Sequence, residues 1–252
     1  MTAPVKKTAA KSVTKKATKA AANATEVKPE KGSAAVLQIA RLQTETIIVP
    51  IVGTSPLIVH RFSEKARKQM LDAMQGVKKV REIKDPKAEF EGAFYRFHDG
   101  RFGFPSIGFK NCTVGGARYY HGVTMTLLRQ VIFMSGTYGV DNQALTEIKG
   151  IGEVVETDDG IGYKLDDVVM REDVVRVGQG GTDLRYRPQF TEWRADLTIK
   201  YVTSQLSRES VLSLVDAGGI GVGVGEWRPE RSGEMGTFTI DENRELIAIT
   251  SK

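Results

Sequence analysis

The residues best suited to binding chemistry lie in a glycine-rich segment from Gly218 to Gly233, which holds six glycines in sixteen residues. Glycines permit left-handed turns, and the backbone amides that they leave uncovered can hold phosphate oxygens. Trp227 adds a stacking plane, and Arg228 adds a cation. We predict a phosphate-binding loop here; the alternative is a tight bend between a helix and a strand. The candidate binding residues are Gly221, Gly223, Gly225, Trp227, Arg228 and Arg231.

A second candidate segment runs from Gly103 to Arg118. Pro105 and Ser106 suit the start of a helix, where free N–H groups and the helix dipole favour an anion. Lys110 and Arg118 add positive charge to the same helix. Phosphate recognition by Ser106, Lys110 and Arg118 is one interpretation, and a plain capped helix with solvated cations is the other.

A third set of candidates consists of arginines that stand among aromatic residues. Arginine beside aromatic side chains can hold a nucleic-acid backbone while bases stack on the rings. Acidic residues alternate with these arginines, so a surface lattice of salt bridges is the alternative. The arginines are Arg171, Arg176, Arg185 and Arg187.

Signals for catalysis are weak. His60, His98 and His121 have no metal-ligand spacing, and Cys112 has no recognisable catalytic partner. The acid pairs Asp158-Asp159 and Asp166-Asp167 fall in predicted loops, where acids are common for conformational reasons. No Gly-Lys-Ser/Thr follows the glycines, which excludes a Walker loop. We therefore expect no enzyme activity, no metal and no cofactor.

The positive charge of the chain is concentrated at its N-terminus. Residues 1–31 hold eight lysines and two glutamates, so the net charge of +5 divides into +6 for this stretch and −1 for the remainder. Residues 1–33 lack large apolar side chains, and we expect a disordered tail. No stretch is long enough for a membrane span, and the single Cys112 fits a reducing, cytoplasmic setting.

The elements that must position these candidates follow from residue patterns. Residues 46–52 predict a buried strand, in which Pro50 favours an edge or a bulge. Ser63 predicts a helix cap with a stop at Gly76, and Ser207 predicts another with a stop at Gly218-Gly219. Residues 192–202 alternate strictly and predict a half-buried strand, and residues 236–240 predict the closing strand. We expect hairpins at Asp159-Gly160 and in a glycine cluster at residues 178–181.

Asp99-Gly100 predicts a tight two-residue hairpin turn. That turn would pair His98 with Arg101, Phe97 with Phe102 and Tyr95 with Phe104 and gather aromatic rings on one side. The rings are either a base-stacking stripe or part of the core.

The order strand, helix, strand, insertion, strand, helix, strand predicts an α+β fold. It is the plan of a ferredoxin-like split βαβ core with a large β-ribbon insertion at about residues 137–190. We expect one domain over residues 34–252, with helices on one face of the sheet.

Two motifs resemble the RAMP superfamily, the ferredoxin-like proteins that form the RNA-binding backbone of CRISPR effector complexes. The first is Phe104-Pro-Ser-Ile-Gly-Phe-Lys110, followed by Ala117-Arg118, and the second is the loop from Gly218 to Gly236. The first motif departs from the family pattern in having no Gly between Pro105 and Ser106 and in having Asn111 after Lys110. Three further segments, 55–60, 170–177 and 223–230, resemble uncharacterised tailed-phage proteins.

These observations predict a protein that binds single-stranded DNA or RNA and forms homo-oligomers along the strand. The resemblances imply a role in phage replication or recombination, in a bacterial cytoplasm, or in RNA handling. One alternative is a metal-independent ribonuclease, as in some RAMP relatives, with His60 or His98 as general base. The other is a virion protein or one that inhibits a host complex.

Overall fold

The computed structural model describes residues 39–77, 83–150, 168–177 and 181–249. Several predictions concern residues outside these ranges: the disordered tail at 1–33, the Asp159-Gly160 hairpin, Gly178 and Gly180, and the acid pairs at 158–159 and 166–167.

The largest sheet is antiparallel, with the strand order β12-β1-β11-β5. Its centre is the nine-residue pairing of β1 with β11, in which Ile47 faces Ile199 and Val49 faces Leu197. These four side chains are almost fully buried. The predicted alternation of residues 192–202 is thereby confirmed. The strands are β1 (Thr44–Gly53), β5 (Ile132–Ser135), β11 (Trp193–Val202) and β12 (Phe238–Ile240), with β13 (Ile247–Ile249) beside β1 and β8 (Lys149–Gly150) beside β11.

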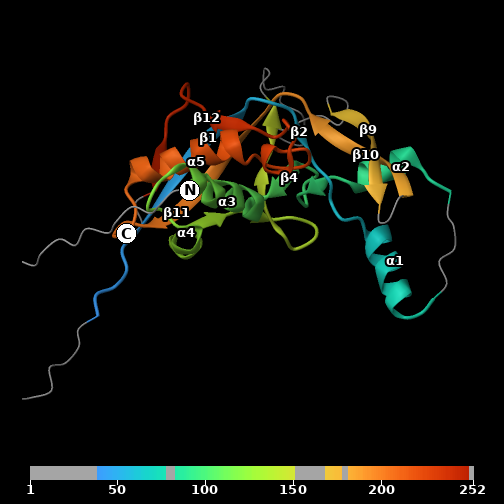
Figure 1. Cartoon of the computed structure of the whole chain (residues 1–252), viewed down its shortest axis with the longest axis horizontal. Helices are drawn as coiled ribbons and strands as arrows, with labels where there is room; N and C mark the ends of the chain where they lie inside the picture. The colour runs from blue at the N-terminus through green and yellow to red at the C-terminus, as the bar shows by residue number, and fades with distance from the viewer. Residues whose placement is uncertain (1–38, 78–82, 151–167, 178–180, 250–252) are drawn as a thin grey trace, which may run out of the picture. The chain divides into compact units, whose positions relative to one another are not determined.

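Two helices lie side by side over the buried face of this sheet, α3 (Ser106–Gly115) and α5 (Arg208–Gly221) (Figure 1). The 3-10 helix η1 (Gly116–Tyr119) continues α3. Phe109 of α3 packs its ring 5.9 Å from that of Phe238 and 6.4 Å from that of Trp193. The predicted helix start at Pro105 and Ser106 is confirmed, and Ser207 caps α5 by accepting a hydrogen bond from Ser210 N.

Pro50 lies in an interior strand, so the expectation of an edge strand is wrong. On the side away from β11, β12 pairs with Ile51–Gly53 and β13 pairs with Thr46–Ile48. The Pro50 carbonyl accepts from Asp241 N between these two short strands, at 2.9 Å. Because N and C=O of one strand residue point to the same side, the missing N–H of Pro50 faces the break between β12 and β13.

The remaining described strands form two smaller sheets. One has the order β2-β10-β9, and the other has the order β3-β4-β7-β6. Phe94 stacks on Phe102 at 4.7 Å, and both contact Phe190 of β10 edge-on. The strands are β2 (Leu57–Ile58), β3 (Tyr95–Arg96), β4 (Phe102–Pro105), β6 (Thr137–Tyr138), β7 (Ala144–Glu147), β9 (Val169–Val177) and β10 (Gly181–Phe190).

The other described helices are α1 (Glu64–Met74), α2 (Pro86–Gly92), α4 (Met125–Val131) and η3 (Pro229–Arg231). As predicted, Ser63 caps α1 by accepting from Ala66 N, and Gly76 follows its end with a φ of 74°. The sequence patterns did not indicate α2, α4 or β13.

The hairpin between β3 and β4 has a register one residue away from the predicted one. Tyr95 pairs with Gly103 and Arg96 with Phe102, so the loop has three residues, His98 to Gly100. The Asp99 side chain accepts from Arg101 N, and of these loop residues only Gly100 takes a positive φ, 87°. After the two-residue turn, a three-residue loop with a left-handed glycine at its end is among the next most common connections in β-hairpins. Phe97, Phe102 and Phe104 are buried, which favours the core interpretation of the aromatic rings.

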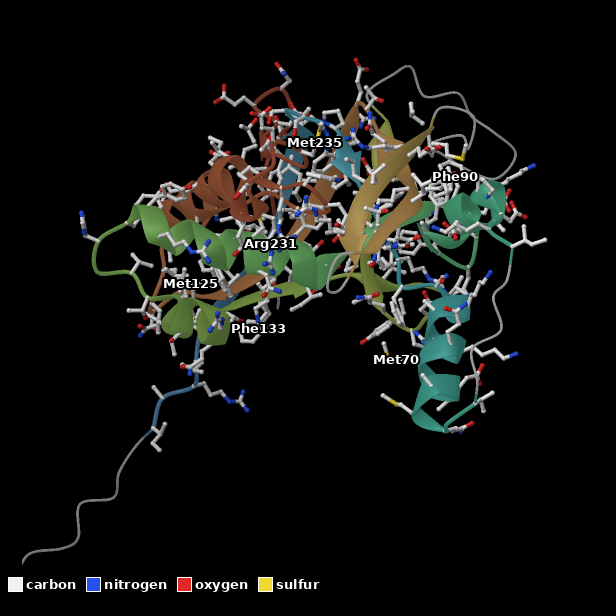
Figure 2. All side chains as sticks on the ribbon, turned by 45° about the vertical axis from the view of Figure 1, so that its right-hand side comes forward. Met70, Phe90, Met125, Phe133, Arg231 and Met235 are labelled. Carbon is white, nitrogen blue, oxygen red and sulfur yellow. The ribbon has the colours of Figure 1, made fainter. Side chains whose placement is uncertain are left out.

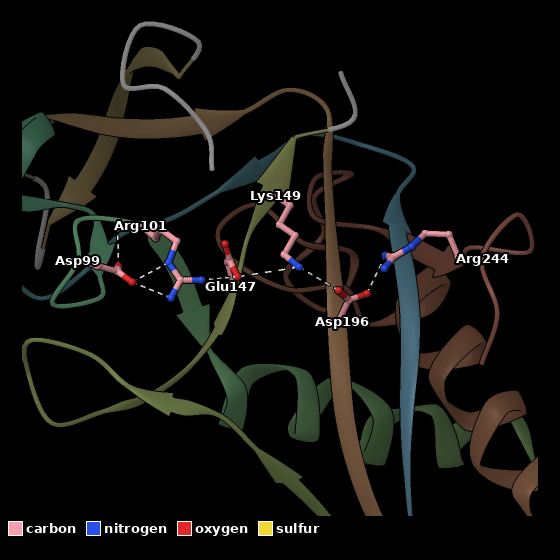
Figure 3. A network of polar contacts seen from close by, with 6 residues as sticks. All are labelled: Asp99, Arg101, Glu147, Lys149, Asp196 and Arg244. Carbon is pink, nitrogen blue, oxygen red and sulfur yellow. Dashed lines mark hydrogen bonds and ion pairs between the residues drawn. The ribbon is translucent and has the colours of Figure 1, made fainter. Parts of the chain in front are cut away.

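Six charged residues of alternating sign run from this hairpin across to the large sheet (Figure 3). Glu147 lies between Arg101, at 2.8 Å, and Lys149, at 3.9 Å. Asp196 of β11 accepts from Lys149 at 3.1 Å and from Arg244 at 2.7 Å. Burial alone would raise the pKa of Asp196, but the hydrogen bonds from Arg244 and Lys149 outweigh it and lower the pKa. Each of the six charged side chains in this network therefore lies next to one of opposite sign.

The α+β prediction is confirmed by this mixture of helices and antiparallel sheets. Of the helices in the described part of the chain, none has both the length and the hydrophobicity that crossing a bilayer requires.

Candidate functional site

The two segments singled out in the sequence line one pocket of about 470 Å³, which we name the α3/α5 pocket. α3 and η1 contribute Gly108, Asn111 and Arg118. The loop after α5, more than a hundred residues further along the chain, contributes Glu226, Arg228 and Glu230. His60, Tyr95 of β3 and two residues of α4, Met125 and Arg129, complete the wall. The charged and polar side chains of the lining are His60, Tyr95, Asn111, Cys112, Arg118, Arg129, Glu226, Arg228 and Glu230.

The glycines of the loop are explained by close packing inside the fold. α5 continues to Gly221, so the predicted helix end at Gly218-Gly219 is wrong. A Cβ on Gly218 would press against the carbonyl oxygen of Cys112 in α3, and one on Gly219 against that of Phe238. Gly223 and Gly225 have φ of 68° and 76°, a region that side chains other than glycine rarely adopt. Close packing therefore accounts for Gly218 and Gly219, and a left-handed backbone accounts for Gly223 and Gly225.

Several backbone amides of the loop are already hydrogen-bonded within the protein. Gly223 N donates to Gly218 O at 3.0 Å, Val224 N to Gly236 O at 2.9 Å, and Glu226 N to Ile58 O at 2.9 Å. These amides are not open to phosphate oxygens, and Gly221 lies in the last turn of α5. The predicted phosphate-binding role is therefore not supported for the amides of Gly221 and Gly223.

Two predicted arginines meet at one carboxylate. Arg118 Nη2 lies 3.1 Å from Glu230 Oε1, and Arg228 Nη2 lies 3.0 Å from Glu230 Oε2. Arg228 also donates from Nη1 to Gly225 O at 3.0 Å, which orients its guanidinium. The hydrogen bond from Arg228 holds the pKa of Glu230 below its usual value, although burial opposes this, and Arg118 adds to the effect. The structure thus places an anionic group between two guanidinium groups.

A second side of the pocket, next to β2 and β10, carries His60, Tyr95 and Glu226. Burial lowers the pKa of His60, and nearby Arg187 lowers it further. Burial raises the pKa of Tyr95, and Glu226 adds to that shift. Both side chains are therefore neutral at pH 7, and the carboxylate of Glu226 supplies the formal charge among these three groups.

Ser106 and Lys110 do not line the pocket. The Ser106 side chain is buried, and its hydroxyl shares a hydrogen bond of 2.9 Å with that of Thr146. Lys110 donates from Nζ to Arg129 O at 3.1 Å, and the same Nζ lies 5.3 Å from the ring centre of Phe133, which Figure 2 labels. Neither side chain is placed to contact a ligand in the pocket.

Trp227 and Arg231 lie in the same loop but outside the lining. Trp227 is 44% exposed, and its backbone has a φ of 56°. Arg231 is exposed at the end of η3 (Figure 2).

The arginines predicted at residues 171–187 do not form one surface. Arg171 pairs with Asp173 at 2.8 Å, and Arg185 lies 3.9 Å from Asp183. Arg176 is exposed on β9. Arg187 is buried behind the pocket, 3.4 Å from Asp173 and 3.8 Å from Glu226. The acidic partners favour the salt-bridge interpretation for Arg171, Arg185 and Arg187.

Among the lining residues that were not singled out as binding residues in the sequence are Asn111, Arg129, Glu226 and Glu230. Asn111 and Glu226 lie inside the two chosen segments, and Arg129 belongs to the unpredicted helix α4. Burial raises the pKa of the Cys112 thiol to about 12, so it is no nucleophile at neutral pH. His98 is exposed in the hairpin loop. The described residues contain no cluster of His, Cys, Asp and Glu suited to a metal ion.

No protein-family model matches the chain, and no curated protein matches it. Among solved structures, the chain is similar to the crystal structure of Cmr6 from Pyrococcus furiosus, with a TM-score of 0.36 and 12% sequence identity. That similarity covers 80% of this chain and 100% of the Cmr6 chain.

Proposed function

We propose that this protein binds single-stranded nucleic acid and holds a backbone phosphate between Arg118 and Arg228. The observation that carries the proposal is that these two arginines, from segments far apart in sequence, converge on one carboxylate in a pocket. Guanidinium groups bind phosphate and carboxylate through the same planar fork of N–H donors. A position that accommodates the Glu230 carboxylate therefore suits a phosphate oxygen pair.

The dimensions of the pocket favour a single strand over a duplex. Its volume of about 470 Å³ is within the range of small-ligand sites, which suits one nucleotide unit. A base inside a duplex must leave the stack before it can enter such a pocket, at a cost of a few kcal/mol. Trp227 beside the pocket offers an exposed ring on which a neighbouring base can stack.

Two further parts of the proposal concern the topology of the large sheet and the number of copies that bind one strand. The strand order β12-β1-β11-β5, with α3 and α5 on one face, supports a split βαβ core. We also propose that copies of the protein bind side by side along one strand, where the lysine-rich N-terminal residues would add salt-sensitive affinity.

Replacing Arg118 and Arg228 together with glutamine is expected to weaken the binding of a labelled single-stranded oligonucleotide by at least about tenfold, because charge-assisted hydrogen bonds contribute roughly 1.5–3 kcal/mol each. For single strands each phosphate contact contributes about 0.7 to the slope of log affinity against log salt concentration, so the slope should fall by about that amount. Fluorescence anisotropy over a salt series measures both quantities.

The matched control is Arg67→Gln/Lys68→Gln, which removes two charges from exposed residues of α1. It should change affinity far less than the pocket variant. Two results contradict the proposal: no binding by the unmodified protein at about 50 mM salt, or equal affinity for the unmodified protein and the pocket variant.

Replacing Glu230 with glutamine is expected to raise oligonucleotide affinity several-fold, because a neutral amide competes less well than a carboxylate with phosphate for Arg118 and Arg228. Glu234→Gln is the control, since Glu234 is an exposed acid of the same loop and does not line the pocket. An affinity for Glu230→Gln at or below that of Glu234→Gln would show that Glu230 does not compete with the ligand.

The proposal contains no catalytic step. His60 is a neutral imidazole in the pocket, and this single observation supports a metal-independent ribonuclease as the second candidate. Cleavage of labelled RNA in the presence of a chelator would favour that candidate.

A further inference from the structure

The side of the α3/α5 pocket next to β2 and β10 has polar groups that phosphate binding leaves unused. Glu226 is anchored there by its backbone, because its N–H donates to Ile58 O at 2.9 Å. The preceding residue, Gly225, is packed so closely that a Cβ would press against the same carbonyl. The backbone that carries Glu226 is therefore held at a defined position beside β2.

The Glu226 carboxylate retains acceptor capacity for a ligand. Its ion pair with Arg187 Nη2 is 3.8 Å long, which is too long for a hydrogen bond. The Glu226 side chain is 42% exposed, whereas that of Arg187 is 3% exposed. The buried guanidinium of Arg187 thus lies on one side of the Glu226 carboxylate. On the side of the pocket, the carboxylate oxygens keep lone pairs that can accept hydrogen bonds from a ligand.

Arg187 itself is incompletely satisfied. Its Nε is buried without a hydrogen-bond partner, and its contact with Asp173 is long, at 3.4 Å. A buried, poorly paired arginine is costly to a fold and calls for a reason other than packing. An electrostatic role in holding the negative charge of Glu226 at the pocket wall supplies one.

The walls around Glu226 suit a flat, partly apolar ring. The rings of Tyr95 and Phe104 both line the pocket, with centres 6.1 Å apart in an edge-on arrangement, and Met125 lines it as well. Neutral His60 adds a hydrogen-bonding edge without a second charge. Nucleobases combine a flat π-face with polar edges and match this combination.

Carboxylate oxygens discriminate among bases by the donors that the bases present. Guanine presents N1–H and N2–H side by side, which match the two oxygens of a carboxylate, and cytosine and adenine each present an amino group. Thymine and uracil present one N3–H donor between two carbonyl oxygens. Those carbonyl oxygens are repelled by the negatively charged oxygens of a carboxylate. The expected order is guanine first and thymine or uracil last.

Resting on the proposed function, we propose that the α3/α5 pocket recognises the base of the nucleotide whose phosphate Arg118 and Arg228 hold, and that Glu226 selects guanine by accepting its paired N–H donors. The ligand is thus a guanine-bearing nucleotide within a single strand.

The test uses the full chain and short thymidine oligonucleotides in which one central nucleotide is varied among the four bases. A central guanine should bind roughly tenfold more tightly than a central thymine, which is the discrimination expected of one bidentate contact. Glu226→Gln should bring that ratio close to one, because an amide offers one acceptor and one donor. Glu234→Gln should leave the ratio unchanged. Displacement of the guanine oligonucleotide by GMP but not by TMP would support the same conclusion.

Glu226→Gln should keep the affinity of the unmodified protein for the thymine oligonucleotide, because a loss of folded protein would weaken the binding of all four oligonucleotides. Equal and tight binding of all four oligonucleotides would overturn base recognition and leave the proposed strand binding intact. A guanine preference that persists in Glu226→Gln would overturn the role of Glu226. Absence of binding to every oligonucleotide would overturn the proposed function itself.

Discussion

Replacing Trp193 with alanine is expected to lower the free energy of unfolding by about 3–5 kcal/mol, the range measured for removal of buried aromatic side chains. Trp193 is fully buried at the start of β11, against Phe109 of α3 and Phe238 of β12. Its Nε1 donates to Ser55 O at 2.8 Å, so alanine would leave both a cavity and a carbonyl without this partner. Chemical denaturation measures the change.

Tyr138→Ala is the control for this experiment, because Tyr138 is an aromatic residue on β6 with an exposed side chain. It should change stability by no more than about 0.5 kcal/mol. If Trp193→Ala is as stable as that control, the packing of α3 against the large sheet does not depend on Trp193, contrary to the structure.

Replacing Gly218 with alanine is expected to destabilise the protein by about 1–3 kcal/mol, the usual cost of overpacking. Helix propensity alone predicts the opposite sign, since alanine in a helix is favoured over glycine by about 1 kcal/mol. Overpacking outweighs that gain because the new Cβ would meet the backbone carbonyl of Cys112, which no side-chain rotation relieves. Gly116 makes the reciprocal approach, where a Cβ would lie 2.6 Å from Leu214 O.

The control is Gly92→Ala at the end of α2, where the nearest atom to the new Cβ is a side-chain atom of Ser63 at 3.8 Å. That variant should be neutral or more stable by up to about 1 kcal/mol. A rise in stability for Gly218→Ala would mean that α3 and α5 are not in close contact. Any separation of the two helices also moves Arg118 away from Arg228, so we expect oligonucleotide affinity to fall with stability.

Local patterns predicted many of the elements for identifiable reasons. The alternation of residues 192–202 reflects the two-residue period of a strand with one buried face, and β11 follows it. Ser63 and Ser207 are N-caps because a hydroxyl satisfies free N–H groups of the first helical turn, an interaction between residues three apart. Such signals are contained within a few residues.

Predictions that depended on a partner elsewhere in the chain were less successful. Asp99-Gly100 indicated a hairpin correctly, but the predicted register was wrong, since an Asp-Gly pair fits both a two-residue turn and the end of a three-residue loop. Pro50 favoured an edge strand or a bulge, yet it lies in an interior strand, where the break between β12 and β13 accommodates its missing donor. The similarity to RAMP and tailed-phage proteins and the single-strand preference stay predictions.

Helix caps, strand alternation and glycine clusters are local, so they predict from sequence the type of many elements and the two segments in which Arg118 and Arg228 lie. Three features become visible only in the folded chain: the two arginines share Glu230, Gly218 allows close contact between α3 and α5, and Arg187 is buried behind Glu226. These features depend on distances between residues far apart in the chain, and the packing of the two helices on the sheet sets those distances.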